Sequence, residues 1–157
     1  MIVKEIRDED FTSYKKPAMV IGFPRCSWKC EKECGERVCQ NSALAQSPDI
    51  EVKYSDIIQR YIENKITSAV IIGGLEPFDT YLQLIEFIEL FRNKTNDDIV
   101  IYTGYCKNEI NKFINNLSQF KNIIVKYGRF IPGHKPHYDE VLGVKLASDN
   151  QYAEVIS

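Results

Sequence analysis

Apolar residues along the chain fall into two alternating patterns, which predict strands and helices in turn. Four short, mostly apolar runs have the pattern of strands buried on both faces: 18–22, 69–72, 99–103 and 122–125. Between them, apolar residues recur three and four positions apart in segments that begin at Tyr54, Tyr81 and Ile110, which predicts three helices. Asp79 or Thr80 is expected to cap the second helix. This alternation predicts an α/β fold with parallel strands and right-handed crossovers.

The two ends of the chain follow other patterns. Residues 2–6 alternate apolar and charged positions, which predicts a half-buried edge strand. Residues 131–139 contain two prolines, a glycine and both histidines, so we expect an exposed loop there. Segments 141–146 and 152–156 are expected to form a closing pair of strands. About four βα units are too few for an eight-fold barrel of ~250 residues, so we predict an open partial (β/α) barrel with a mostly parallel sheet, in a single domain over residues 1–157.

Composition and charge narrow the classes of partner. The net charge of −2 gives no electrostatic case for binding nucleic acid or an anionic membrane. No apolar run approaches the roughly 20 residues that a membrane-spanning helix needs, and the first ten residues are too charged for a secretory signal. We therefore expect a cytoplasmic protein, in which clustered cysteines bind metal in preference to forming disulfides.

Four of the five cysteines lie in residues 26–39, here called the cysteine segment: Cys26, Cys30, Cys34 and Cys39. Thiolates this close together on a charged loop favour a soft metal. One possibility is a closed zinc site with all four thiolates, although the gaps of three, three and four residues differ from the usual C-x-x-C pair. The other is a [4Fe–4S] cluster held by three of them, which leaves the fourth iron free for a ligand.

Three loops follow predicted parallel strands and are expected to meet. They are the cysteine segment, Gly73-Gly74 and Thr103-Gly104. In parallel α/β sheets ligands bind at the carboxyl ends of the strands, so these loops should lie on one rim. Paired glycines let a ligand approach the backbone closely, and Glu76 can accept hydrogen bonds from an ammonium group.

Together these residues resemble the motifs of radical S-adenosylmethionine enzymes, in particular the activating proteins of anaerobic ribonucleoside-triphosphate reductases. Cys26-x-x-x-Cys30 matches the first two ligands of the C-x-x-x-C-x-x-C motif, and Cys39-Gln-Asn resembles the segment around the third. Gly73-Gly-Leu-Glu-Pro77 resembles the Gly-Gly-Glu-Pro sequence that meets the methionyl amino group. Other similar segments extend the resemblance from about Pro17 to the end of the chain: 98–105, 128–130 and 148–151.

The chain departs from that family at three places. Eight residues separate Cys30 from Cys39 where the family has two, and this insertion carries Cys34, which remains an alternative third ligand. Leu75 interrupts the Gly-Gly-Glu-Pro sequence. Lys126-Tyr127 stands where the activating proteins commonly have an acidic residue before a glycine.

The resemblance implies a [4Fe–4S] cluster and S-adenosylmethionine as cofactors, and it implies which residues bind them. The cluster ligands would be Cys26, Cys30 and Cys39. The residues that meet S-adenosylmethionine would be Val38, Gln40, Gly73, Gly74, Glu76 and Thr103, the first two through their backbone at the adenine.

The activity implied is reductive cleavage of S-adenosylmethionine to methionine and a 5′-deoxyadenosyl radical. In the activating proteins this radical takes a hydrogen atom from a glycine of a partner glycyl-radical enzyme, such as anaerobic ribonucleotide reductase, and flavodoxin or ferredoxin supplies the electron. Two alternatives remain open from the sequence. One is a radical S-adenosylmethionine enzyme that acts on another peptide or a small molecule, and the other is a non-enzymatic four-cysteine zinc module that binds another protein.

Overall fold

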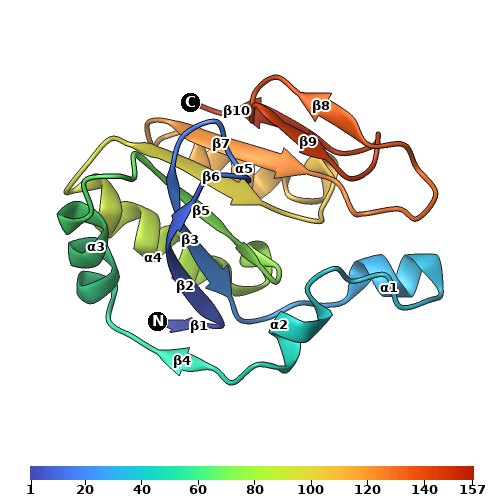
Figure 1. The fold of residues 1–157 in the computed structure, drawn as a ribbon, viewed down its shortest axis with the longest axis horizontal. Coiled ribbons are helices and arrows are strands. Elements are labelled where there is room, and N and C mark those ends of the chain that lie inside the picture. The colour runs from blue at the N-terminus through green and yellow to red at the C-terminus, as the bar shows by residue number, and fades with distance from the viewer.

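A six-stranded mixed sheet forms the centre of the computed structural model, which describes residues 1–157 (Figure 1). The strand order is β10-β7-β6-β5-β3-β2. Their bounds are β2 Glu5–Asp10, β3 Ala18–Phe23, β5 Ala69–Gly74, β6 Asp98–Tyr102, β7 Ile123–Tyr127 and β10 Tyr152–Val155. The inner four strands are parallel, whereas β2 and β10 are antiparallel to their neighbours at the two edges.

The predicted open partial (β/α) barrel is wrong, because the sheet is mixed: antiparallel strands border the parallel strands at both edges. Helices α3 (Tyr54–Glu63), α4 (Tyr81–Arg92) and α5 (Asn111–Leu117) lie in the connections between the four parallel strands. An antiparallel strand then borders this parallel group on each side. Such a strand needs no helical crossover to reach its neighbour, so the βα repeat that would carry a barrel further round ends at both edges.

The positions of the four buried strands and the three helices predicted from the sequence are confirmed. Each strand is buried along nearly its whole length, as its apolar run requires. Each helix buries the stripe that its three- and four-residue spacing defines, for example Ile57, Ile58 and Tyr61 in α3. Local pattern therefore located these elements correctly although it did not give the shape of the sheet.

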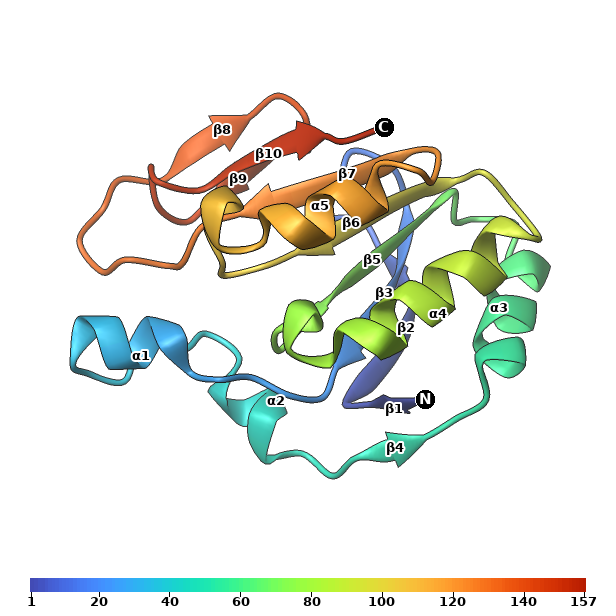
Figure 2. The ribbon, with the colours of Figure 1, turned by 180° about the vertical axis from the view of Figure 1, so that it is seen from behind.

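The two faces of the sheet are covered differently. Figure 2 shows α4 and α5 in front of the strands, and with α3 they pack against one face. Alternate strand residues point to the opposite face, among them Val20, Ile71 and Val100, and these pack with Tyr14 and Leu142. No helix packs in that second cluster, which is covered by the chain around β8 (His137–Asp139) and β9 (Val144–Leu146).

Both ends of the chain depart from the prediction. The segment 2–6 is split, because β1 (Ile2–Val3) pairs with β4 (Ile50–Glu51) and β2 begins at Glu5. The predicted pairing of 141–146 with 152–156 is wrong, since β9 pairs with β8 and β10 pairs with β7. The reason is Asp139, a buried carboxylate that accepts hydrogen bonds from the backbone of Leu142 and Ala153, at 2.9 Å each. It joins the β8–β9 hairpin to β10, and it makes the end of the predicted 131–139 loop a strand.

The remaining helices are short and lie near the carboxyl ends of the strands. They are α1 (Lys29–Cys34), α2 (Ser42–Gln46), and the 3₁₀ turns η1 (Pro77–Thr80) and η2 (Lys107–Glu109). No helix in the chain combines the length and the apolar character that crossing a membrane requires.

Two leucines of α4 provide a matched test of the core. Leu84 is fully buried, whereas Leu82 is 81% exposed on the same helix. We expect Leu84→Ala to lower the free energy of unfolding by about 2–5 kcal/mol, because it leaves a cavity, and Leu82→Ala to change it by less than about 0.5 kcal/mol. Urea denaturation followed by circular dichroism measures both values. Equal losses would contradict this assignment of the buried face of α4.

Candidate functional site

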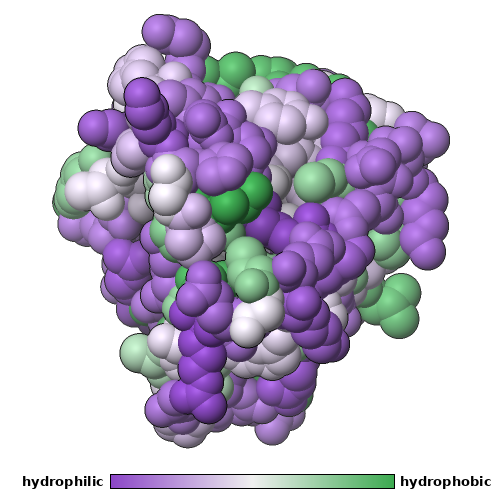
Figure 3. All heavy atoms as spheres, turned by 90° about the vertical axis from the view of Figure 1, so that its right-hand side faces the viewer, coloured by the Kyte–Doolittle hydropathy of each residue, from purple (hydrophilic) through white to green (hydrophobic).

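A cavity of about 430 Å³ lies on the face of the sheet that the helices leave uncovered. This volume is within the range of about 300–1,000 Å³ that is usual for small-molecule sites. Figure 3 shows the side of the molecule that carries the cysteine segment, where a recess opens in a mostly hydrophilic surface. All nine residues predicted to bind the cluster or S-adenosylmethionine line this cavity: Cys26, Cys30, Val38, Cys39, Gln40, Gly73, Gly74, Glu76 and Thr103.

The cysteines differ in how they relate to the cavity. Cys26, Cys30 and Cys39 are half-buried in its wall, whereas Cys34 is exposed and does not line it. Cys106 is also exposed. The structure thus separates the four cysteines of the segment into three that face the cavity and one that faces solvent.

Burial disfavours the charged form of the cavity thiols when no cation is near. It raises the pKa of Cys26 to about 11, and burial and then the neighbouring Cys39 raise the pKa of Cys30. A bound metal reverses this effect, because a coordinating thiol is deprotonated. Trp28 N donates to Cys26 Sγ at 3.2 Å from a backbone with φ of 57°, and hydrogen bonds to sulfur are one means by which proteins stabilise iron–sulfur ligands.

Three thiols on one cavity wall are enough to hold a [4Fe–4S] cluster. In such a cluster each cysteine binds its own iron, so the thiols need not meet at one point. A cluster held by three cysteines keeps one iron without a protein ligand.

Polar contacts hold the cysteine segment in place, because α1 buries no residue. Asp79 accepts hydrogen bonds from Ser27 N at 2.5 Å and from the Tyr105 hydroxyl at 2.6 Å. Thr80 stands at the N-cap position of α4, one of the two positions expected, but its side chain makes no capping hydrogen bond. Asp79 binds the cysteine segment instead. Arg129 lies 2.8 Å from Glu109 and 3.2 Å from Glu33 of α1, so it ties the other end of the helix to the body of the protein.

The end of β5 runs beside the residues that lead into the cysteine segment. Leu75 N donates to Phe23 O at 3.2 Å, and Glu76 N donates to Arg25 O at 2.7 Å. Gly74 has φ of +81°, and a Cβ atom there would lie 2.6 Å from the Cα atom of Gly22. Leu75 therefore extends the pairing of β5 with the lead-in, and the chain still turns Glu76 into the cavity.

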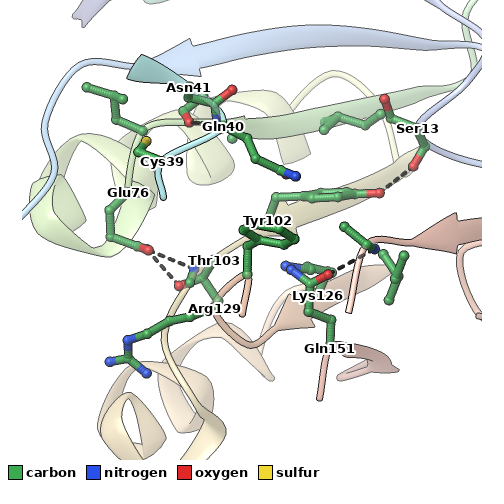
Figure 4. Close-up of a pocket in the computed structure, with 18 of the residues that line it drawn as sticks. Ser13, Cys39, Gln40, Asn41, Glu76, Tyr102, Thr103, Lys126, Arg129 and Gln151 are labelled. Carbon is green, nitrogen blue, oxygen red and sulfur yellow. Dashed lines mark hydrogen bonds between the residues drawn. The ribbon is translucent and has the colours of Figure 1, made fainter. Parts of the chain in front are cut away.

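Glu76 is a buried carboxylate that accepts three hydrogen bonds from the protein. Its side chain accepts hydrogen bonds from Thr103 Oγ1 at 2.7 Å, Gly104 N at 2.9 Å and Phe78 N at 3.2 Å (Figure 4). Burial raises its pKa to about 7 in spite of these donors. Thr103 thus orients Glu76 as well as lining the cavity. Glu76 accepts only neutral hydrogen-bond donors and makes no ion pair, so its carboxylate is suited to a cation that enters the cavity.

Among the polar cavity residues that were not predicted from the sequence, three are more than nine-tenths buried: Lys126, Arg129 and Gln151. A lysine between Val125 and Tyr127, inside an otherwise apolar strand, was the available signal for the first. The two histidines lie outside the cavity lining, as the loop interpretation implied; His134 pairs with Asp149 at 2.6 Å.

Three half-buried thiols on the wall of an open cavity suit an iron–sulfur site. The chain belongs to the family of 4Fe-4S single cluster domains, whose family model matches residues 19–151. The matched region contains the cysteine segment and the four parallel strands, except for Ala18 at the start of β3. No curated protein and no solved structure matches the chain.

Gly74 and Gly133 form a matched pair for testing the close approach of β5 to β3. Both have φ of +81°, but a Cβ atom at Gly133 would meet nothing within 4 Å. We expect Gly133→Ala to cost about 1 kcal/mol through backbone strain. Gly74→Ala should cost about 1–3 kcal/mol more, because the methyl group must displace the backbone of Gly22. Equal values in denaturant titrations would show that the two backbones are not in contact.

The raised pKa of Glu76 predicts a dependence of stability on pH. Between about pH 4.5 and 7 the folded protein keeps a proton that the unfolded chain has released, so the free energy of unfolding falls as pH rises. Over this interval the free energy of unfolding of the wild-type protein should fall by at most about 1.4 kcal/mol per pH unit relative to that of Glu76→Gln. Above pH 8 the two free energies should depend on pH in the same way. Denaturant titrations of both proteins from pH 5 to 8 measure the difference. Parallel curves throughout would mean that Glu76 titrates normally.

Proposed function

We propose that this protein is a radical S-adenosylmethionine enzyme, in which Cys26, Cys30 and Cys39 hold a [4Fe–4S] cluster. The observation that carries the proposal is the composition of one cavity wall. Three thiols, two glycines and a buried carboxylate line the same cavity, and Cys34 lies outside it. A closed zinc site would require Cys34 to join the other three, so its exposed position favours the cluster over the zinc module.

The bound cluster would supply one electron to S-adenosylmethionine, which splits into methionine and a 5′-deoxyadenosyl radical. The protein's own residues position that cofactor and limit side reactions. Glu76 accepts hydrogen bonds from the methionyl ammonium, and its orientation is fixed by Thr103 at 2.7 Å. Gly73 and Gly74 let the cofactor approach the end of β5 without a side chain in the way.

Val38 and Gln40 flank Cys39 and line the cavity beside it. We assign their backbone to the adenine ring. Asn41 supports this part of the segment, because its side-chain nitrogen donates to Gly74 O at 2.6 Å. The third cysteine and the glycine turn are thereby joined, and a cofactor that binds one of them lies close to the other.

We further propose that the radical is used to install a glycyl radical on a partner such as anaerobic ribonucleotide reductase, with flavodoxin or ferredoxin as electron donor. Support comes from the sequence resemblance at 98–105, 128–130 and 148–151. The cavity also extends past Tyr102 towards Arg7 of β2 and Leu146 of β9, which leaves room for a substrate group beyond the cofactor. Electron paramagnetic resonance tests the choice of partner. A mixture of both proteins with reductant and S-adenosylmethionine should show the doublet signal of a glycyl radical.

Cysteine variants test the ligand assignment. After anaerobic reconstitution, Cys39→Ala should lose most cluster iron, its broad visible absorption and the formation of 5′-deoxyadenosine, because two thiolates remain for three irons. Cys34→Ala should keep all three at close to wild-type levels, and Cys106→Ala is the control for removal of an exposed thiol. Iron analysis, absorption spectra and product chromatography give the three readouts.

The reverse result would make Cys34 the third ligand. A colourless protein that binds one zinc ion, and loses it whichever of the four segment cysteines is replaced, would overturn the proposal in favour of the zinc module.

A further inference from the structure

The carboxylate of Asp79 lies against the start of the cysteine segment. It belongs to η1, and its Oδ2 atom accepts a hydrogen bond from Ser27 N at 2.5 Å. Its Oδ1 atom accepts another from the Tyr105 hydroxyl at 2.6 Å. That hydroxyl also lies 3.1 Å from Ser27 Oγ, so the three residues form a closed ring of hydrogen bonds. Both oxygens of Asp79 are thereby fixed beside the residue that follows Cys26.

The backbone that Asp79 holds also carries the hydrogen bond to the first thiol. Trp28 follows Ser27 and has φ of 57°, a left-handed conformation that residues other than glycine rarely adopt. In this conformation its N–H donates to Cys26 Sγ at 3.2 Å. Apolar packing does not hold this turn, because α1 buries no residue. The hydrogen bond from Ser27 N to Asp79 therefore helps to position the loop that presents Cys26.

The charge of Asp79 is not compensated by a neighbouring cation. Both of its partners are neutral donors, and it makes no ion pair. The cations closest to this end of the segment pair with other carboxylates: Arg25 with Asp49, and Lys29 with Glu109. Asp79 therefore leaves a full negative charge beside the first proposed cluster ligand.

A negative charge at this position acts on a metal centre held by Cys26. Burial is the main cause of the raised pKa of Cys26, and the carboxylates of Glu76 and Asp79 add to it, so both charges act at the sulfur. The reduction potential of an iron–sulfur cluster depends on the charge and the hydrogen bonds around it. A nearby anion lowers this potential, because it repels the added electron.

We propose that Asp79 is a positioning residue of the cluster site and that its charge lowers the reduction potential of the cluster bound at Cys26. This inference rests on the proposed function, in which the reduced cluster gives one electron to S-adenosylmethionine. A lower potential favours that transfer. Glu76 loses its effect once it pairs with the ammonium of the cofactor, whereas Asp79 does not line the cavity and keeps its charge.

A redox titration of the anaerobically reconstituted protein measures the effect without S-adenosylmethionine or a partner. Titanium(III) citrate is the reductant, and electron paramagnetic resonance follows the reduced cluster. Asp79→Asn keeps the size of the side chain and one acceptor oxygen but removes the charge. We expect its ratio of reduced to oxidised cluster at a fixed potential to rise at least threefold, an upward shift of about 28 mV or more for one electron.

Four further variants separate charge from structure. Asp79→Ser, a second neutral variant, should shift the ratio in the same direction, and Asp79→Glu, which keeps the charge, should stay within about twofold of wild type. Tyr105→Phe removes one hydrogen bond to Asp79 but leaves its charge, so it should also stay within about twofold. Glu36→Gln is the matched control, because Glu36 is exposed like Asp79 but is not tied to the backbone beside Cys26. Iron content and circular dichroism check loading and folding.

An unchanged or lower ratio in the neutral variants would overturn the inference. An equal rise in Tyr105→Phe or Glu36→Gln would do so as well, because the effect would then not be specific to the charge of Asp79. Two neutral variants that hold no cluster would assign Asp79 a purely structural role and reject its effect on the potential. In each of these cases, cleavage of S-adenosylmethionine by the wild-type protein would leave the proposed function standing. Wild-type protein that assembles no redox-active cluster would overturn both.

Discussion

Backbone pairing between the end of β5 and the residues before Cys26 determines the geometry of the cavity. Gly74 brings the two backbones together, and hydrogen bonds from Leu75 to Phe23 and from Glu76 to Arg25 continue the contact beyond the sheet. The first thiol and the buried carboxylate are consequently placed by the same few backbone atoms. This rigid connection matters because α1 buries nothing and cannot fix the segment through apolar packing.

The face of the sheet that carries no helices is the second condition for the site. Helices α3, α4 and α5 cover one face, and antiparallel strands end the parallel group at both edges. The carboxyl ends of the four parallel strands therefore lie beside an open space, the cavity. Glu76 and Lys126 both face this space, and burial shifts the pKa of each towards its neutral form. Strongly shifted pKa values of buried groups cluster at functional sites.

Local sequence pattern was sufficient to locate the four parallel strands and the three helices between them. Strands buried on both faces give continuous apolar runs, and helices with one buried face give a three- and four-residue spacing. It failed where pairing depends on distant residues. Asp139 joins Leu142 to Ala153, and no pattern in the last thirty or so residues indicates that choice. Asp79 was similarly misread as a helix cap, because its partners Ser27 and Tyr105 are remote in the sequence.

The sequence by itself determined the chemical character of this protein: a crowded set of thiols, a glycine turn after a buried strand, and an order of strands that brings their ends together. Tertiary structure alone decided which thiols face the cavity, that antiparallel strands border the sheet at both edges, and that Lys126 is buried without an ion-pair partner. The physical reason is that thiolate chemistry and periodicity are properties of neighbouring residues, whereas burial and charge pairing depend on segments that meet only when the chain folds.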